Sequence, residues 1–274
     1  MYEASARSTA GLATLVGLPH AQPFESPSSW LTRAALTQGV APSELLLFMG
    51  FSTDQIRSTD PDLLLTSKAG LAALKQAGPA AGMVVAARVF TALLTIDPDA
   101  TSLLRAGKAK ARFRFCPMCL REQRQPHLEV HCRFSPWRFC PLHYCLMEDF
   151  CAHCSMPMEL PFDMVRAGRS GSSVASLAEC QRCGEKLNRV QPVSLREIAL
   201  DPYERLRIEN GRAFLAGLYY NKVMLKDGDW AALPECKPYL KAVTFWGERS
   251  WHLAHEVRDS VGRRAQITRA SLMS

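Results

Sequence analysis

The sequence predicts a mainly α-helical protein with two small, irregular metal-binding modules in its central part. Apolar residues recur at helical spacing before and after residues 112–190. Within that stretch the helical spacing is lost, and four pairs of cysteine or histidine residues follow one another instead. The chain has 274 residues, of which 47% are hydrophobic, and this is enough for a core and for two or three domains.

Residues 1–27 are predicted to form an extended N-terminal arm. Pro19, Pro23 and Pro27 punctuate this segment, and proline lacks the backbone N–H that a helix or a sheet needs. We therefore treat the arm as separate from the domains that follow it.

A helical domain with a helix-turn-helix-like start is predicted over residues 28–110. Ser28, or the serine after it, can cap a first helix that ends at Gly39. Pro42 can open a second helix that ends before Gly50. Two short helices joined in this way have the proportions of a helix-turn-helix. The same pair is also a common packing unit that does not touch nucleic acid, and the pattern leaves both interpretations open.

Further helices are expected on both sides of the central stretch. The apolar spacing predicts helices over residues 63–76 and 80–94, and a C-terminal helical region over 191–274 that ends in a helix over 245–262. Residues 166–173 are rich in glycine and serine and are expected to be a flexible connection. The core candidates of the C-terminal region are apolar or aromatic: Tyr203, Leu206, Phe214, Leu215, Leu218 and Tyr219.

Tandem zinc-binding modules are predicted over residues 111–190. A gap of two residues lets both side chains of a pair face one ion, two pairs complete a tetrahedron, and thiolate with imidazole suits zinc. We expect two structural zinc ions per chain, since four protein ligands leave no open position for water. The expected ligands are Cys116, Cys119, Cys140, His143, Cys151, Cys154, Cys180 and Cys183.

The grouping of these pairs into sites rests on the short link between the second and third pairs. Because seven residues separate His143 from Cys151, we favour two sequential sites, although the spacing also allows a cross-braced arrangement. Cys132, Cys145 and Cys236 have no partner at ligand spacing and are expected to be small buried hydrophobic residues.

Positive charge gathers just before and within the first module. The chain has a formal net charge of +7, and residues 105–124 contain seven lysines and arginines against Glu122 alone. Such a segment can hold a phosphate backbone by counterion release, or it can be a solvated linker. The candidates for contacts with nucleic acid or an acidic protein surface are Arg112, Arg114, Arg121, Arg124 and Arg138.

The sequence favours a protein without catalytic activity. His127-Leu-Glu129 followed by Cys140-Pro-Leu-His143 superficially resembles a zinc deaminase motif, but Cys116 and Cys119 would fill the coordination position that catalysis needs. Neither a phosphate-binding loop of Walker type nor a nucleophile elbow is present in the sequence. No apolar run approaches membrane-spanning length, and the N-terminus does not read as a signal peptide. We therefore expect a cytoplasmic protein, in a compartment where thiols stay reduced.

Two separate motifs resemble the TniQ family of transposon proteins. The central one runs Phe115-Cys-Pro-Met-Cys-Leu120, Trp137, Cys140-Pro-Leu-His143, Leu146 and Cys151-x-x-Cys154. The N-terminal one combines Pro23-Phe-Glu-Ser26 with Ser29-Trp-Leu-Thr-Arg33-Ala-Ala35. Tyr144 and Ser155 stand where the family often has glycine. The two motifs lie in the family's order and cover about residues 20–190.

The resemblance implies a target-selection adaptor in DNA transposition. Proteins of this family link a target-recognition element, either DNA or a CRISPR effector complex, to an AAA+ ATPase that recruits the transposase. The region Pro23–Gly50 would then contact the ATPase or a second protomer in a homodimer, and the zinc modules would contact nucleic acid or the effector. The expected partner contacts are Pro23, Glu25, Trp30 and Arg33. The alternative is a stand-alone zinc-ribbon and helix-turn-helix regulator that reads a DNA groove directly.

Overall fold

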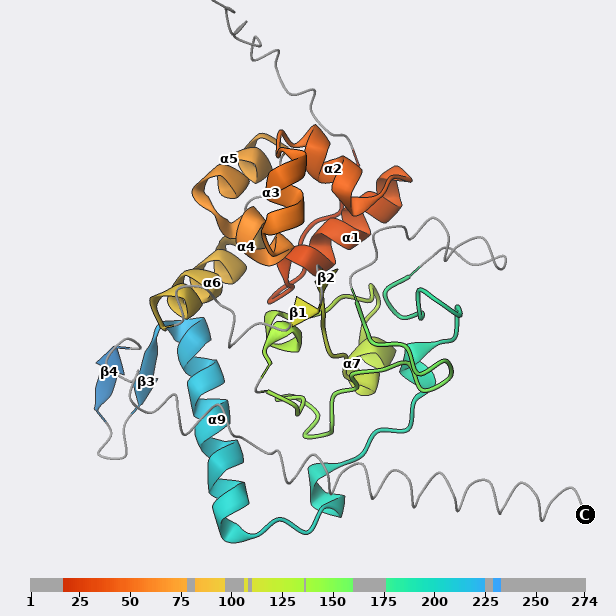
Figure 1. The fold of residues 1–274 in the computed structure, drawn as a ribbon. Coiled ribbons are helices and arrows are strands. Elements are labelled where there is room, and N and C mark those ends of the chain that lie inside the picture. The colour runs from red at the N-terminus through yellow and green to blue at the C-terminus, as the bar shows by residue number, and fades with distance from the viewer. Residues whose placement is uncertain are drawn as a thin grey trace, which may run out of the picture.

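The computed structural model describes residues 17–77, 82–96, 106–107, 110–135, 137–159, 176–224 and 229–232. The predictions for most of the N-terminal arm, for the connection at 166–173 and for the helix over 245–262 lie outside these residues. The described part is rich in helix and has little strand (Figure 1).

Five short helices form the N-terminal helical region, which we define as residues 27–77. They are α1 (Pro27–Gln38), α2 (Pro42–Phe48), α3 (Thr53–Ser58), α4 (Pro61–Thr66) and α5 (Lys68–Ala77). These helices gather at one end of the protein, drawn in orange and red in Figure 1. They enclose a core of their own, in which Trp30, Leu65 and Leu74 are fully buried.

The first two helices begin and end close to the predicted residues. Ser26, two residues before the predicted cap, accepts a hydrogen bond from the backbone N–H of Ser29 at 3.2 Å and caps α1. Gly39 has a φ of 69°, the left-handed conformation that commonly ends a helix. Pro42 opens α2 as predicted. The helices are present, but their assignment as a DNA-binding helix-turn-helix stays a prediction.

Two features of this region were not predicted. The helix α3 has no buried residue, so it lacks the apolar spacing by which the other helices were predicted, and a capping box between Ser52 and Gln55 marks its start. The predicted helix over residues 63–76 is interrupted at Ser67, where α4 ends before α5 begins. A Cβ atom on Gly70 would lie 2.3 Å from the carbonyl oxygen of Leu64, so the start of α5 packs against the end of α4 too closely for a side chain.

Two longer helices lie beside the central stretch. They are α6 (Val84–Ile96) and α9 (Pro202–Tyr220), which contact each other (Figure 1). Leu215 and Leu218 are buried as predicted, whereas Tyr203 and Leu206 are exposed, so the prediction of these two as core residues is wrong. They belong to the N-terminal half of α9, whereas the buried face of its C-terminal half meets α6 and the metal modules in one shared core.

Short irregular elements make up the metal region, which we define as residues 110–200. Its helical turns are α7 (Pro117–Glu122), η2 (Val130–Arg133), η4 (Leu187–Arg189) and η5 (Leu195–Glu197). The strands β1 (Ala106–Gly107) and β2 (Lys110–Ala111) pair at its start, and β3 (Lys222–Met224) and β4 (Trp230–Ala232) pair after it, both antiparallel. Phe113, Phe115 and Trp137 are buried in its core.

Main-chain hydrogen bonds join the segment just before α1 to the metal region. The N–H of Ser26 donates to the carbonyl of Leu128 at 2.8 Å, and the N–H of Val130 donates to the carbonyl of Phe24 at 2.9 Å. The entrance to α1 is thereby held beside the first metal module. Among the described helices, none combines the length and the apolar character that crossing a lipid bilayer demands.

Candidate metal centres

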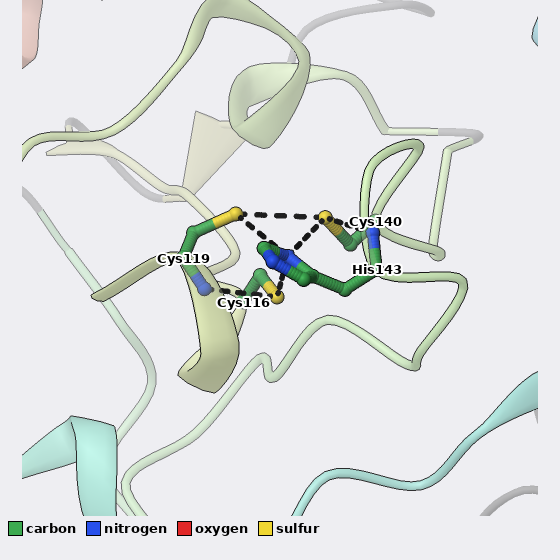
Figure 2. A group of neighbouring side chains, drawn as sticks. All are labelled: Cys116, Cys119, Cys140 and His143. Atoms are coloured by element: carbon green, nitrogen blue, oxygen red, sulfur yellow. Dashed lines mark hydrogen bonds between the residues drawn. The ribbon is translucent and has the colours of Figure 1, made fainter. Parts of the chain in front are cut away.

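The first two cysteine and histidine pairs form one compact group. The ligand atoms of Cys116, Cys119, Cys140 and His143 all lie within 4.8 Å of one another. Figure 2 shows the three sulfur atoms around the imidazole of His143, whose Nδ1 lies 3.5, 3.3 and 3.4 Å from the Sγ atoms of Cys116, Cys119 and Cys140. Four donors that converge in this way fit one tetrahedral metal ion.

Local backbone geometry places the donors of the first group. Cys116 precedes α7 as its N-cap, and its Sγ accepts a hydrogen bond from the backbone N–H of Cys119 at 3.5 Å. Hydrogen bonds from the thiol of Cys119 and from neighbouring thiols lower the pKa of Cys116 well below its usual value. The same contacts raise the pKa of Cys119 and of Cys140, so the group without a metal ion favours a single thiolate, and the other two cysteines lose their protons when a metal ion binds.

Glu122 fixes the orientation of the histidine ligand. The Nε2 atom of His143 lies 2.9 Å from Oε2 of Glu122, while Nδ1 faces the sulfur atoms. A carboxylate on the second ring nitrogen holds the imidazole in one tautomer and one orientation, a common arrangement around metal ions. Glu122 therefore supports the group without being one of its ligands.

The third and fourth pairs form the second group. The ligand atoms of Cys151, Cys154, Cys180 and Cys183 also lie within 4.8 Å of one another. The Sγ atom of Cys151 lies 3.7 Å from that of Cys183, and the Sγ of Cys154 lies 3.7 Å from that of Cys180. The structure thus brings together the pairs in sequential order, and the cross-braced arrangement is not observed. The two groups could each hold one metal ion.

Three of the four pairs share one backbone turn. In each, the N–H four residues after the first cysteine donates to the carbonyl of that cysteine, at 2.9 Å from Tyr144, 2.8 Å from Ser155 and 2.8 Å from Gly184. These three residues have φ values of 51°, 57° and 74°. The turn needs the left-handed conformation that glycine adopts most easily. Tyr144 and Ser155 adopt it without being glycine, so the departures from the family pattern do not change the turn.

The five candidate arginines lie in different environments. Arg114 is only 2% exposed, and its guanidinium donates to the carbonyl oxygens of Phe134, Ser135 and Trp137. It cannot reach a phosphate, so its prediction as a contact residue is wrong. Arg112 pairs with Glu159 at 3.3 Å and is partly exposed. The remaining three are exposed or partly exposed: Arg121, Arg124 and Arg138.

The predicted partner contacts in the N-terminal motif are mostly internal. Trp30 is fully buried, and its Nε1 donates to the carbonyl of Pro19 at 2.8 Å. Glu25 is buried and pairs with Arg33 at 2.5 Å. Trp30 and Glu25 hold the start of α1 in place and offer no exposed surface to a partner, which corrects their prediction, whereas Arg33 is partly exposed and stays a candidate. Pro23 is exposed and stays a candidate.

Sequence reasoning missed several buried polar residues of the metal region. Arg133 is fully buried and binds the carboxylates of Asp60 and Asp62 in the N-terminal helical region. His131 lies 3.4 Å from Glu129, where burial lowers the pKa of the imidazole to about 4 and raises the pKa of the carboxyl to about 7. The partners of Arg133 are 71 and 73 residues away, so no local pattern marks them.

Cys145 was also missed as a neighbour of the first group. Its Sγ atom lies 3.5 Å from the Sγ of Cys116. The prediction that it is a buried residue holds, since it is 2% exposed, but it does have a sulfur partner. The contact joins residues 29 positions apart and has no signal in the spacing of the sequence.

Comparison with known proteins agrees with the motifs. Residues 17–147 match the family model described as TniQ, which confirms the resemblance found in the sequence. The matched residues extend from the segment before α1 through the first metal group. A search of the curated proteins finds no match for this chain.

Proposed function

We propose that this TniQ-domain protein is a target-selection adaptor in DNA transposition. TniQ is a non-catalytic accessory domain of transposition, and the match over residues 17–147 is the observation that carries the proposal. In the proposed mechanism the protein links a target-recognition element, either DNA or a CRISPR effector complex, to an AAA+ ATPase regulator and through it to the transposase. The protein acts in the bacterial cytoplasm, close to the nucleoid.

Two structural zinc ions are part of this proposal. Seven thiols and one imidazole in two groups match the donor types that zinc prefers, and the described ligand sets are closed. A bound ion supplies a cross-link among four side chains that the short elements around them could not hold by packing alone. The chain's own contribution is to orient His143 through Glu122 and to place the cysteines by the shared backbone turn.

The two regions of the protein differ in formal charge. The N-terminal helical region together with the arm before it, residues 17–77, has four lysines and arginines against five aspartates and glutamates. The metal region, residues 110–200, has thirteen against nine. Phosphate backbones are held by an excess of positive charge. This supports a nucleic acid or ribonucleoprotein partner for the metal region and a protein partner, the ATPase or a second copy, for the N-terminal helical region.

Arg121 and Arg124 are the phosphate contacts that we propose first. Both are exposed at the end of α7 and just after it. The guanidinium of Arg121 donates from Nε and Nη2 to the carbonyl of Asn188, at 3.2 and 3.0 Å, which holds α7 against η4. The third nitrogen, Nη1, lies 3.6 Å from the Sδ atom of Met118, a weak acceptor that a phosphate oxygen could replace. Arg112 and Arg138 are secondary candidates.

A tagged pull-down with ATP and magnesium, read by mass spectrometry, tests the adaptor function. We expect an AAA+ ATPase in the eluate, and CRISPR subunits beside it would identify the targeting route. Recovery of DNA without an ATPase, together with a footprint of the purified protein on one duplex site, would favour the stand-alone regulator.

A further inference from the structure

The first metal group contains a fifth thiol. The Sγ atom of Cys145 contacts the Sγ of Cys116 at 3.5 Å, and both side chains are 2% exposed. Cys145 is not one of the four residues whose ligand atoms all lie within 4.8 Å of one another. Cys145 therefore contacts one of the ligands, Cys116, without being a ligand itself.

The backbone turn shared by the metal pairs does not explain this cysteine. In each of the three turns the N–H of the first cysteine donates to the carbonyl of the residue five positions later, at 2.8 Å to Cys145, 2.9 Å to Met156 and 2.8 Å to Glu185. Methionine and glutamate thus make the same main-chain contact in the second group. At this position of the turn only the first group has a thiol, so the three turns differ in the side chain and not in the main-chain contact.

A thiol in this position has one chemical use that fits its surroundings. A cysteine S–H is a weak donor, and a metal-bound thiolate is an anionic acceptor that strengthens such a hydrogen bond. The buried setting of both sulfur atoms strengthens it further, because water does not compete there. The main-chain bond between Cys140 and Cys145 fixes the position of the donor relative to the group.

We propose that Cys145 is a positioning residue that donates its S–H to the metal-bound thiolate of Cys116, and that it tunes how tightly the first centre holds its metal. The inference rests on the proposed zinc sites. Removing electron density from a ligand sulfur by hydrogen bonding makes that sulfur less nucleophilic, so the same contact protects Cys116 from alkylation. In the second centre the corresponding positions of the turn are Met156 and Glu185, which carry no thiol, so the cysteines of that centre are expected to be more reactive.

The test compares Cys145→Ala and Cys145→Ser in the full chain, with Cys132→Ala as the matched control. Cys132 is buried in the same core but is outside the ligand group. Cobalt(II) replaces zinc for absorption spectra, and iodoacetamide labelling followed by peptide mass spectrometry reports each cysteine separately. Zinc transfer to a chelator gives the retention of the metal. The second centre in every sample is an internal reference.

The expected result has three parts. Cys145→Ala shifts the thiolate-to-cobalt charge-transfer band, speeds labelling of Cys116, and weakens metal retention at the first centre by roughly tenfold, as loss of an outer hydrogen bond commonly does. Cys145→Ser restores retention because its hydroxyl is also a donor. Cys132→Ala and the second centre behave as in the unmodified protein. If the alanine variant does not fold, Cys145→Val, which also lacks a donor and is close to cysteine in size, takes its place, and an unchanged charge-transfer band in that variant overturns the proposal.

Other outcomes distinguish a failure of this inference from a failure of the proposed metal sites. Unchanged spectra and labelling in Cys145→Ala would show that the thiol only fills space. Spectra that report four sulfur ligands at both centres, and three at the first in the alanine variant, would make Cys145 a ligand in place of His143 and overturn the positioning role. A folded protein that binds neither zinc nor cobalt would overturn both the proposed sites and this inference.

Discussion

The Nε atom of Arg133 donates to Oδ2 of Asp62 at 2.6 Å, and both side chains are almost completely buried. Arg133 lies in the metal region and Asp62 at the start of α4, so this ion pair ties the two regions together. Asp62 also accepts hydrogen bonds from the N–H and the hydroxyl of Ser28, at 2.6 and 2.9 Å. Asp60 binds the same guanidinium.

Arg133→Met is expected to destabilise the protein strongly. The variant leaves the carboxylates of Asp60 and Asp62 without their cation, and Asp62 is fully buried. Breaking one partner of a buried ion pair typically costs about 3–5 kcal/mol of the free energy of unfolding. Urea unfolding followed by circular dichroism measures this loss.

The matched control for that variant is Arg112→Met. Arg112 forms an ion pair with Glu159 at 3.3 Å, but its side chain is 36% exposed, so water screens the interaction. Pairs of this kind contribute roughly 0–1 kcal/mol. Equal losses in the two variants would contradict the conclusion that the Arg133 pair joins the regions.

The metal content of purified protein tests the two proposed sites separately. We expect two zinc ions per chain, with His143→Ala removing one and Cys183→Ala removing the other. Elemental analysis gives the stoichiometry, and each variant serves as the control for the other. Loss of both ions in both variants would mean that the two groups depend on each other. Well-folded protein without zinc would exclude both proposed zinc sites.

Ser155→Gly is expected to stabilise the second module. Ser155 has a φ of 57°, a conformation that costs most residues about 1 kcal/mol and costs glycine little. Gly184 occupies the same position in the neighbouring pair with a φ of 74°, so Gly184→Ser should destabilise by a similar amount. The melting temperatures of the two variants should therefore move in opposite directions. A lower melting temperature for Ser155→Gly would show that the serine side chain has a role of its own.

The residues that the sequence predicts well are those whose partners lie close along the chain. Cys140 and His143 are three positions apart, so their spacing alone predicts a shared ion, and the ends of α1 and α2 follow from the nearby Gly39 and Pro42. Turn and cap chemistry acts over three to five residues, which is why such predictions succeed.

The residues that the sequence predicts poorly have partners far along the chain. Arg114 looked like a solvated cation in a basic segment, but its guanidinium is bound by carbonyl oxygens 20 to 23 residues later. Glu25 and Arg33 looked like surface contacts and instead neutralise each other beside α1. A charged residue has the same local pattern in both settings, so only the folded structure separates a buried cation from a free one.

Charge reversal at Arg121 and Arg124 tests whether the metal region holds a phosphate backbone. Each phosphate contact contributes close to one unit to the slope of log affinity against log salt, so losing two contacts should flatten that slope by roughly two. Fluorescence anisotropy with labelled duplex at several salt concentrations measures affinity and slope together. We expect Arg121→Glu with Arg124→Glu to weaken binding most at low salt.

The control for this prediction is the same change of charge in the N-terminal helical region. Lys68 and Lys75 are exposed on α5, so Lys68→Glu with Lys75→Glu alters the net charge of the protein equally without touching the metal region. If general electrostatic attraction governs binding, the two double variants will lose affinity equally. If the end of α7 is the contact surface, only the arginine variant will show a flatter salt slope. Unchanged slopes in both would leave these arginines as solvated residues and direct attention to Arg112 and Arg138.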